Sequence, residues 1–185
     1  MTMTPLLPSL ADLDQRSQQL VQRTQDLPPT GSRPLTIYGR VCGWATAAAV
    51  DCLRQISAVQ VTAEAVHIAW NETPNDRVND LLAHIAQRLD EAGLVKAWRN
   101  ELLDVVAEGV NVAAIERGAV RPLGLLTQAV HLNAWSHDGR LWVAKRAANK
   151  PTDPNMWDTL VGGLAVAYES LDTSLLRESQ EEAGL

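Results

Sequence analysis

Apolar residues recur at helical spacing in two stretches of the N-terminal two-thirds of the chain. The clearer helix follows Asn75-Asp76 and can end at Gly93, with one apolar face made of Val78, Leu81, Leu82, Ile85 and Leu89. A first helix is predicted after Ser9, a good N-cap residue, with Asp12 three residues on. We expect its apolar residues to face inward: Leu10, Leu13, Leu20 and Val21.

The segments around these helices predict a mixture of strands and helices. In order, they indicate a loop over 27–34, a short strand over 35–39, a helix over 45–56, extended structure over 59–70, a strand within 94–106 and a short helix within 110–120. Pro122 interrupts the predicted helical segment, and the residues after it predict a different succession of elements, which begins with a β-hairpin. We therefore predict a small α+β domain over residues 1–122 and a second domain over 123–185.

The second part predicts a β-hairpin, a loop, further extended structure and a helix. Strands over 128–135 and 140–147 flank Ser136-His137-Asp138-Gly139, in which glycine supplies the positive φ that such turns often need. Residues 148–156, with Pro151 and Pro154, predict a loop. Residues 157–166 predict extended structure interrupted by Gly162-Gly163, and residues 171–183 predict a helix.

Composition and charge narrow the class of protein. The chain has 185 residues, 46% of them hydrophobic, and a net charge of −6 with scattered Lys and Arg, which argues against a nucleic-acid partner. No apolar run approaches the roughly 20 residues that span a bilayer, and the first 13 residues do not resemble a signal peptide. Cys42 and Cys52 favour two buried free thiols over a disulfide, so we expect a cytoplasmic protein without a membrane partner.

The last predicted helix carries a cluster of acids. Glu178, Glu181 and Glu182 lie at i, i+3 and i+4, so a helix places them on one face. Carboxylates that close together repel one another unless a cation neutralises them, and hard oxygen ligands suit Mg²⁺ or Mn²⁺. A solvated acidic surface is the alternative explanation for such a triplet.

Other residues support a capped, amphipathic helix at this position. Ser170 can cap it, Asp172 lies in its first turn and Gly184 is placed to end it. Leu171, Leu175 and Leu176 provide an apolar side to bury. Arg177 can pair with a neighbouring acid, and the double glycine before the helix allows a close backbone approach to a metal or phosphate.

The complete spacing resembles the signature of the Nudix hydrolase superfamily, G-x5-E-x7-R-E-U-x-E-E-x-G-U, where U is a bulky aliphatic residue. The fixed positions are matched by Gly163, Glu169, Arg177, Glu178, Glu181, Glu182 and Gly184. Leu185 fits the last position, and Ser179 is the one departure, at a U position. The stretches AWRNELLDVV, IERGAV and VHLNAW resemble a thiamine-pyrophosphokinase-related branch, which carries its own extra N-terminal domain.

The resemblance implies an enzyme that hydrolyses a diphosphate linkage with Mg²⁺ or Mn²⁺ as cofactor. Glu178, Glu181 and Glu182 would bind metal and act in catalysis, Arg177 would orient a glutamate, and Glu169 and the Gly163 carbonyl would support the metal. The branch implies thiamine diphosphate or its damaged analogues as substrate, released as monophosphates. Trp157, Lys145 and Arg146 are candidate substrate contacts, although packing explains Trp157 and a solvated strand end explains the two cations equally well.

The resemblance also sets an expectation for the architecture. Residues 123–185 would form the first half of a Nudix α/β/α sandwich, which needs further strands and a helix, so we expect the chain to be a fragment with weak or absent catalysis. A homodimer is one arrangement that would cover the exposed side of the helix. The alternative function is a non-catalytic interaction or oligomerisation module built on residues 1–122, with the acidic segment disordered.

Overall fold

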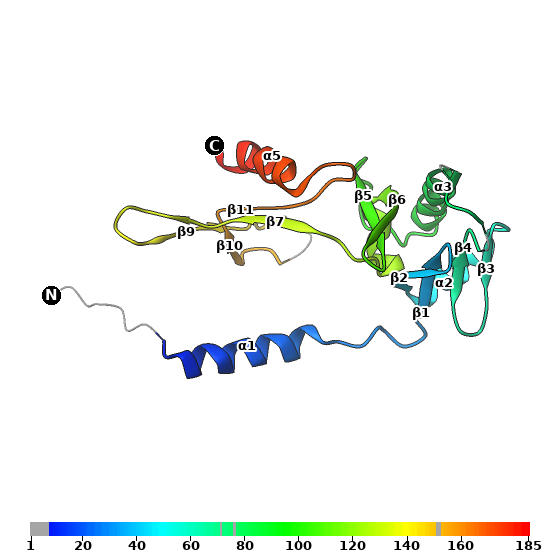
Figure 1. The fold of residues 1–185 in the computed structure, drawn as a ribbon, viewed down its shortest axis with the longest axis horizontal. Coiled ribbons are helices and arrows are strands. Elements are labelled where there is room, and N and C mark those ends of the chain that lie inside the picture. The colour runs from blue at the N-terminus through cyan, green and yellow to red at the C-terminus, as the bar shows by residue number, and fades with distance from the viewer. Residues whose placement is uncertain (1–7, 71, 76, 151–152) are drawn as a thin grey trace.

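The computed structural model describes residues 8–70, 72–75, 77–150 and 153–185, and its helices and mixed sheets give the α+β fold that was predicted (Figure 1). The predictions for the first seven residues, for Asp76 and for Pro151 lie outside the described residues. The helices are α1 (Leu10–Thr24), α2 (Ala47–Leu53), α3 (Arg77–Glu91), α4 (Val120–Leu123) and α5 (Leu171–Ala183), with a 3-10 turn η1 (Arg117–Ala119) before α4. The strands are β1 (Arg33–Ile37), β2 (Arg40–Ala45), β3 (Val59–Val61), β4 (Val66–Ile68), β5 (Leu102–Ala107), β6 (Val110–Glu116), β7 (Ala129–Leu132), β8 (Ala134–Trp135), β9 (Leu141–Lys145), β10 (Trp157–Thr159) and β11 (Val161–Leu164).

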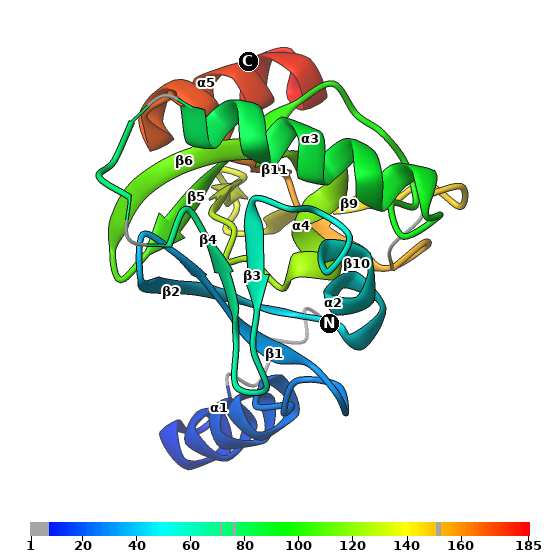
Figure 2. The ribbon, with the colours of Figure 1, turned by 90° about the vertical axis from the view of Figure 1, so that its right-hand side faces the viewer.

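The main hydrophobic core lies in the N-terminal part of the chain. It contains a four-stranded sheet in the order β2-β1-β4-β3. In this sheet β1 is parallel to β4, whereas the β1–β2 and β3–β4 pairs are antiparallel. The hairpin of β5 and β6 packs against α3, as the second view shows (Figure 2). Fully buried side chains from the sheet, α2 and α3 form one cluster with this hairpin, including Leu35, Ile68, Leu53, Leu82, Ile85, Leu89 and Leu103.

Two glycines allow β2 and α4 to approach each other at backbone distance. A Cβ on Gly43 would lie 2.7 Å from the carbonyl oxygen of Leu123, and one on Gly124 would collide with the carbonyl oxygen of Trp44. The contact is completed by the N–H of Thr46, which donates to the carbonyl of Pro122 at 2.9 Å. This packing fixes the position of α4 against the core sheet.

The C-terminal part consists of two small sheets and α5. β7 pairs antiparallel with β11, and β9 lies between β8 and β10. The predicted turn is confirmed: Gly139 has φ +79°, and Ser136 Oγ and the Arg140 backbone are hydrogen-bonded at 3.0 Å. α5 packs against β11 and β7, which places the acidic helix over the strand that carries the double glycine.

Several local predictions are wrong. The segment 110–120 is mostly strand β6 and not a helix, because it pairs with β5 along its whole length. Gly162 and Gly163 lie inside β11, and the extended segment breaks at Leu160 instead. Strand β2 was not predicted, since Arg40–Ala45 mixes glycine with buried and exposed positions.

The helix over Leu10–Thr24 is confirmed, but its apolar residues do not face inward. It has the predicted Ser9 cap with a reciprocal hydrogen bond to Asp12. No residue of α1 is buried, and Leu10, Leu13, Leu20 and Val21 are 81%, 47%, 60% and 49% exposed. The helix lies apart from the rest of the described chain in Figure 1, so its apolar side has no partner there.

Both cysteines are free and buried, as predicted. Burial disfavours the thiolate and raises the pKa of Cys42 to about 12, and it also raises the pKa of Cys52. None of the helices within the described ranges combines the length and the apolar character that crossing a membrane requires.

Gly43→Ala tests the backbone contact between β2 and α4. We expect a loss of about 2 kcal/mol in the free energy of unfolding, because the added methyl group overpacks a contact made by carbonyl oxygens. Arg40→Ala, at an exposed position in the same strand, is the control and should change stability by no more than about 0.5 kcal/mol. Urea unfolding measures both, and equal stability of Gly43→Ala and wild type would contradict the close approach.

Candidate functional site

The acidic helix α5 begins and ends at the residues that the sequence predicted. The Ser170 hydroxyl accepts a hydrogen bond from the N–H of Thr173 at 3.1 Å, and Gly184 adopts the left-handed conformation at the C-terminus with φ +67°. Only part of the predicted leucine side is buried: Leu175 is half-buried, whereas Leu171 and Leu176 are 48% and 72% exposed. The fully buried positions of the helix are Ser174 and Ser179, whose small side chains allow α5 to lie close to β7 and β11.

Arg177 is the centre of an ion-pair network along this helix, as predicted. Its Nη1 atom donates to Glu178 Oε1 at 2.9 Å and lies 3.5 Å from Glu181 Oε2. Its Nε atom donates to Glu169 Oε2 at 3.3 Å, and this carboxylate also accepts from the Ser174 hydroxyl at 2.9 Å. Burial opposes the charge on Arg177, but the hydrogen bonds to Glu178 and Glu169 outweigh it and raise the pKa of the guanidinium.

Glu178 lies directly against the glycine strand. Its side chain is only 12% exposed, and a Cβ on Gly163 would collide with all three atoms of its carboxylate group. Glu182 reaches the same strand, because its Oε2 accepts a hydrogen bond from the Gly162 N–H at 3.0 Å. The double glycine therefore brings backbone into contact with the acids of α5. Its predicted close approach to a metal or phosphate stays a prediction.

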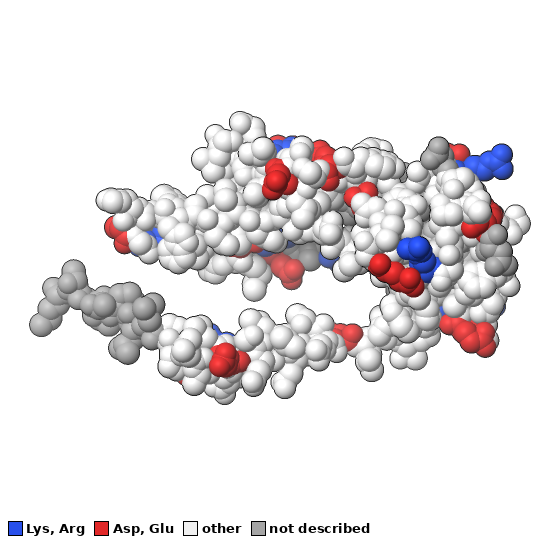
Figure 3. Space-filling view, viewed as in Figure 1, with Lys and Arg blue, Asp and Glu red and all other residues white. Residues whose placement is uncertain are grey.

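The acids face one region but do not yet converge on one point. Within the described ranges, no group of three His, Cys, Asp or Glu side chains is arranged to hold a metal ion. Glu169, Glu178 and Glu181 contact Arg177, whereas Glu182 contacts Gly162. The donor chemistry suits a hard divalent cation, since Glu178 and Glu182 contact the Gly162-Gly163 segment while Glu169 and Glu181 lie beside Arg177. Acidic atoms are visible at the surface over α5 in the space-filling view (Figure 3).

The three candidate substrate contacts lie on the neighbouring β9–β10 pair. Trp157 is 70% exposed and stands opposite the exposed Lys145 in the strand register, so Trp157 is not a core residue. Arg146 is half-buried and donates to Asp158 Oδ2 at 2.8 Å and to the carbonyl of Asp153 at 3.0 Å. His131 Nδ1 lies 3.0 Å from Thr159 Oγ1, so His131 is a hydrogen-bonded residue of strand β7.

Sequence reasoning missed two residues that support the acids. Ser174 positions Glu169, and Gly162 positions Glu182 through its backbone. Ser174 is a small polar residue, so apolar periodicity gave no indication of its burial. Outside the helix, Arg117 pairs with Glu101 at 2.5 Å, and Glu116 accepts hydrogen bonds from backbone N–H groups.

Comparison with known proteins identifies this part of the chain. Residues 126–185 match the NUDIX domain family, and this range includes β7, the glycine strand β11 and the acidic helix α5. The C-terminal segment is therefore similar to Nudix domains. The Nudix signature thus coincides with the elements that place the four glutamates against Gly162 and Gly163.

Curated relatives extend the similarity beyond the Nudix segment. An uncharacterised protein of Saccharomyces cerevisiae is 34% identical over 119 residues, which are 60% of this chain and 34% of that protein. Nudix hydrolase 24, chloroplastic, of Arabidopsis thaliana is 34% identical over 128 residues, 64% of this chain and 34% of its own length. Nudix hydrolase 20, chloroplastic, of the same plant is 33% identical over 120 residues, 62% of this chain and 32% of its own length. The matched segments span about a third of each relative.

Arg177→Gln tests the ion-pair network in the absence of metal. We expect a loss of about 2 kcal/mol in the free energy of unfolding, because Glu178 would remain buried without its cation. Arg140→Gln, which breaks an exposed pair with Asp138, is the control and should cost under about 0.5 kcal/mol. Urea unfolding in EDTA measures both, and similar losses for the two variants would contradict a central role of Arg177.

Asp158→Asn tests the pair that holds Arg146. The hydrogen bond from Arg146 lowers the pKa of Asp158 below its ordinary value of 3.8, so the pair stabilises the fold above that pH and loses its effect as the pH falls through the folded-state pKa. We expect the variant to be less stable than wild type by about 1 kcal/mol near neutral pH. Urea unfolding should show this difference shrinking in acid, whereas a difference independent of pH would refute the assignment.

Proposed function

We propose that the protein is a divalent-metal-dependent hydrolase of the Nudix type, which cleaves a diphosphate linkage in a small molecule. The observation that carries this proposal is the contact of Glu178 with Gly163, beside Glu181 and Glu182 on the same helix. Glu178 is 12% exposed and lies against a glycine, whereas an acid that only decorates a surface would point into solvent. A metal ligand needs this closeness, because backbone and carboxylate oxygens must reach one cation.

The proposed metal is Mg²⁺ or Mn²⁺, held by Glu178, Glu181 and Glu182, with Glu169 and the Gly163 carbonyl in support. When bound, such a cation would screen the charge of a diphosphate and activate water for attack. The chain itself supplies the orientation: Arg177 fixes Glu178, and the Gly162 N–H fixes Glu182. We propose these as the catalytic residues of the site.

The finer substrate class is thiamine diphosphate or its damaged analogues, released as monophosphates. The resemblance of the upstream segments to the thiamine-related branch suggests it, and the exposed Trp157 offers a surface on which a heteroaromatic ring can stack. Lys145 and Arg146 would then lie toward its phosphates, with Arg146 already oriented by Asp158. We also propose a domain boundary near Pro122 and a homodimer.

The cytoplasmic location stays a prediction that rests on the free thiols. Both plant relatives carry the word chloroplastic in their names.

The non-catalytic alternative has the acidic segment disordered, whereas α5 here is a helix capped at both ends and packed on β11. We therefore favour the enzyme.

Binding of Mn²⁺ tests the metal site separately from catalysis. Glu178→Gln and Glu182→Gln should each weaken binding by about tenfold or more, because each removes an anionic ligand. Asp172→Asn is the matched control, since it removes an acid from the exposed first turn of the same helix and should bind like wild type. The loss of the free Mn²⁺ resonance signal measures binding, and equal affinities in all four proteins would remove the assignment.

Hydrolysis is tested on a panel of diphosphates in Mg²⁺, with thiamine diphosphate among them. We expect monophosphate release to fall by about 100-fold in Glu181→Gln and Glu182→Gln, since both lose charge at the proposed metal. Asp172→Asn again serves as the control. Equal rates in wild type and both glutamine variants would overturn the proposal.

A further inference from the structure

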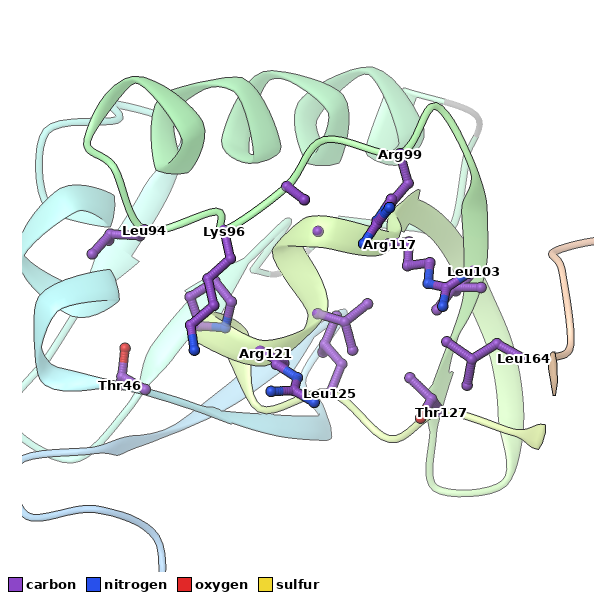
Figure 4. A pocket seen from close by; sticks show the side chains of 14 residues that line it. Thr46, Leu94, Lys96, Arg99, Leu103, Arg117, Arg121, Leu125, Thr127 and Leu164 are labelled. Carbon is purple, nitrogen blue, oxygen red and sulfur yellow. The ribbon is translucent and has the colours of Figure 1, made fainter. Parts of the chain in front are cut away.

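A second feature with the properties of a binding site lies outside the acidic helix. An open cavity of about 590 Å³ is lined by the 94–99 loop, by β5 and by the segment from η1 through α4 to Thr127 (Figure 4). Its size falls within the range of small-molecule sites. One wall is Leu164 of β11, which directly follows Gly163. Nothing in the Nudix signature accounts for this cavity.

The charged residues that line the cavity are all basic, and one of them, Arg117, is paired with Glu101 at 2.5 Å. Lys96 and Arg99 come from the loop, Arg117 from η1 and Arg121 from α4, and no acidic residue lines the cavity. This is unexpected in a chain with 22 acidic and 16 basic residues. Figure 4 shows these four side chains around the same hollow, two from the loop, one from η1 and one from α4. Such a concentration of cations creates a local positive potential that attracts anions.

The backbone around the cations is held in place by a buried carboxylate. Glu116 is only 4% exposed, and its Oε1 accepts hydrogen bonds from the N–H groups of Arg99 at 2.7 Å and Gly118 at 3.1 Å. This one side chain therefore joins the two segments that present the basic residues. Gly118 permits their contact, since a Cβ there would lie 2.7 Å from the carbonyl oxygen of Ala97. These contacts therefore hold the backbone segments that carry Arg99 and Arg117 in fixed positions.

The interior of the cavity is apolar. Leu103, Val120 and Leu125 line it, and the first two are almost fully buried. A basic rim above an apolar interior suits a ligand with a charged group at one end and a hydrophobic body. Several cations around one opening favour a group with more than one negative charge, and arginine binds phosphate oxygens in pairs.

We propose that this cavity binds a small organic phosphate, with its phosphate group among Lys96, Arg99, Arg117 and Arg121 and its apolar body against the leucines. The binding needs no metal, in contrast to the acidic site on α5, because the positive charge comes from the protein itself. The site is therefore separate from the proposed diphosphate hydrolysis and stands whether or not that activity is found.

The test uses phenyl phosphate and inorganic phosphate as probes, measured by isothermal titration calorimetry in EDTA and low salt. Phenyl phosphate should bind about tenfold more tightly than inorganic phosphate, because its ring enters the apolar interior. Lys96→Gln and Arg99→Gln should each weaken phenyl phosphate binding by about tenfold. Both residues are exposed in the loop, so the variants should fold, and thermal melting checks this.

Arg40→Gln is the matched control, since it removes an exposed cation that does not line the cavity. It should leave the affinity for phenyl phosphate unchanged. Absence of binding up to millimolar phenyl phosphate would overturn the proposal. Equal weakening by Arg40→Gln and Arg99→Gln would also overturn it, because attraction by overall charge would then explain the binding.

Discussion

The guanidinium of Arg177 contacts three carboxylates, and the arrangement of the Nudix segment depends on it. These contacts join Glu169, in the turn before α5, to Glu178 and Glu181 on the helix. Removing the Glu178 carboxylate from water costs free energy, which the neighbouring cation offsets. Paired with Arg177, this carboxylate lies over Gly163 while α5 rests on β7 and β11 through its small serine side.

The same contacts define what a metal must displace. Arg177 pairs with three carboxylates and Glu182 adds a fourth nearby, so this region retains excess negative charge that a divalent cation would reduce. A cation that binds Glu178 and Glu181 competes with Arg177, and one that binds Glu182 competes with the Gly162 N–H. Metal affinity is therefore the difference between new bonds to the cation and these existing contacts. Arg177 holds the acids in place while they carry no metal.

The sequence predicts elements well where local chemistry determines them and poorly where tertiary contacts do. Both ends of α5 follow from Ser170 and Gly184, which cap a helix whatever surrounds it. The exposure of Leu171 and Leu176 could not be predicted, because periodicity shows that a helix has an apolar side but not whether a neighbour covers it. The basic cavity was missed for a related reason. Its cations are spread from Lys96 to Arg121, and tertiary contacts such as those of the buried Glu116 bring their segments together.

The most direct measurement of the central claim is an anomalous difference map at the manganese edge, from crystals grown in Mn²⁺. The account predicts a peak between the carboxylates of Glu178, Glu181 and Glu182 and the backbone of Gly163, with Glu181 and Glu182 turned away from their present partners. A map with no peak at this position, in which Arg177 and Gly162 still hold the acids, would contradict it.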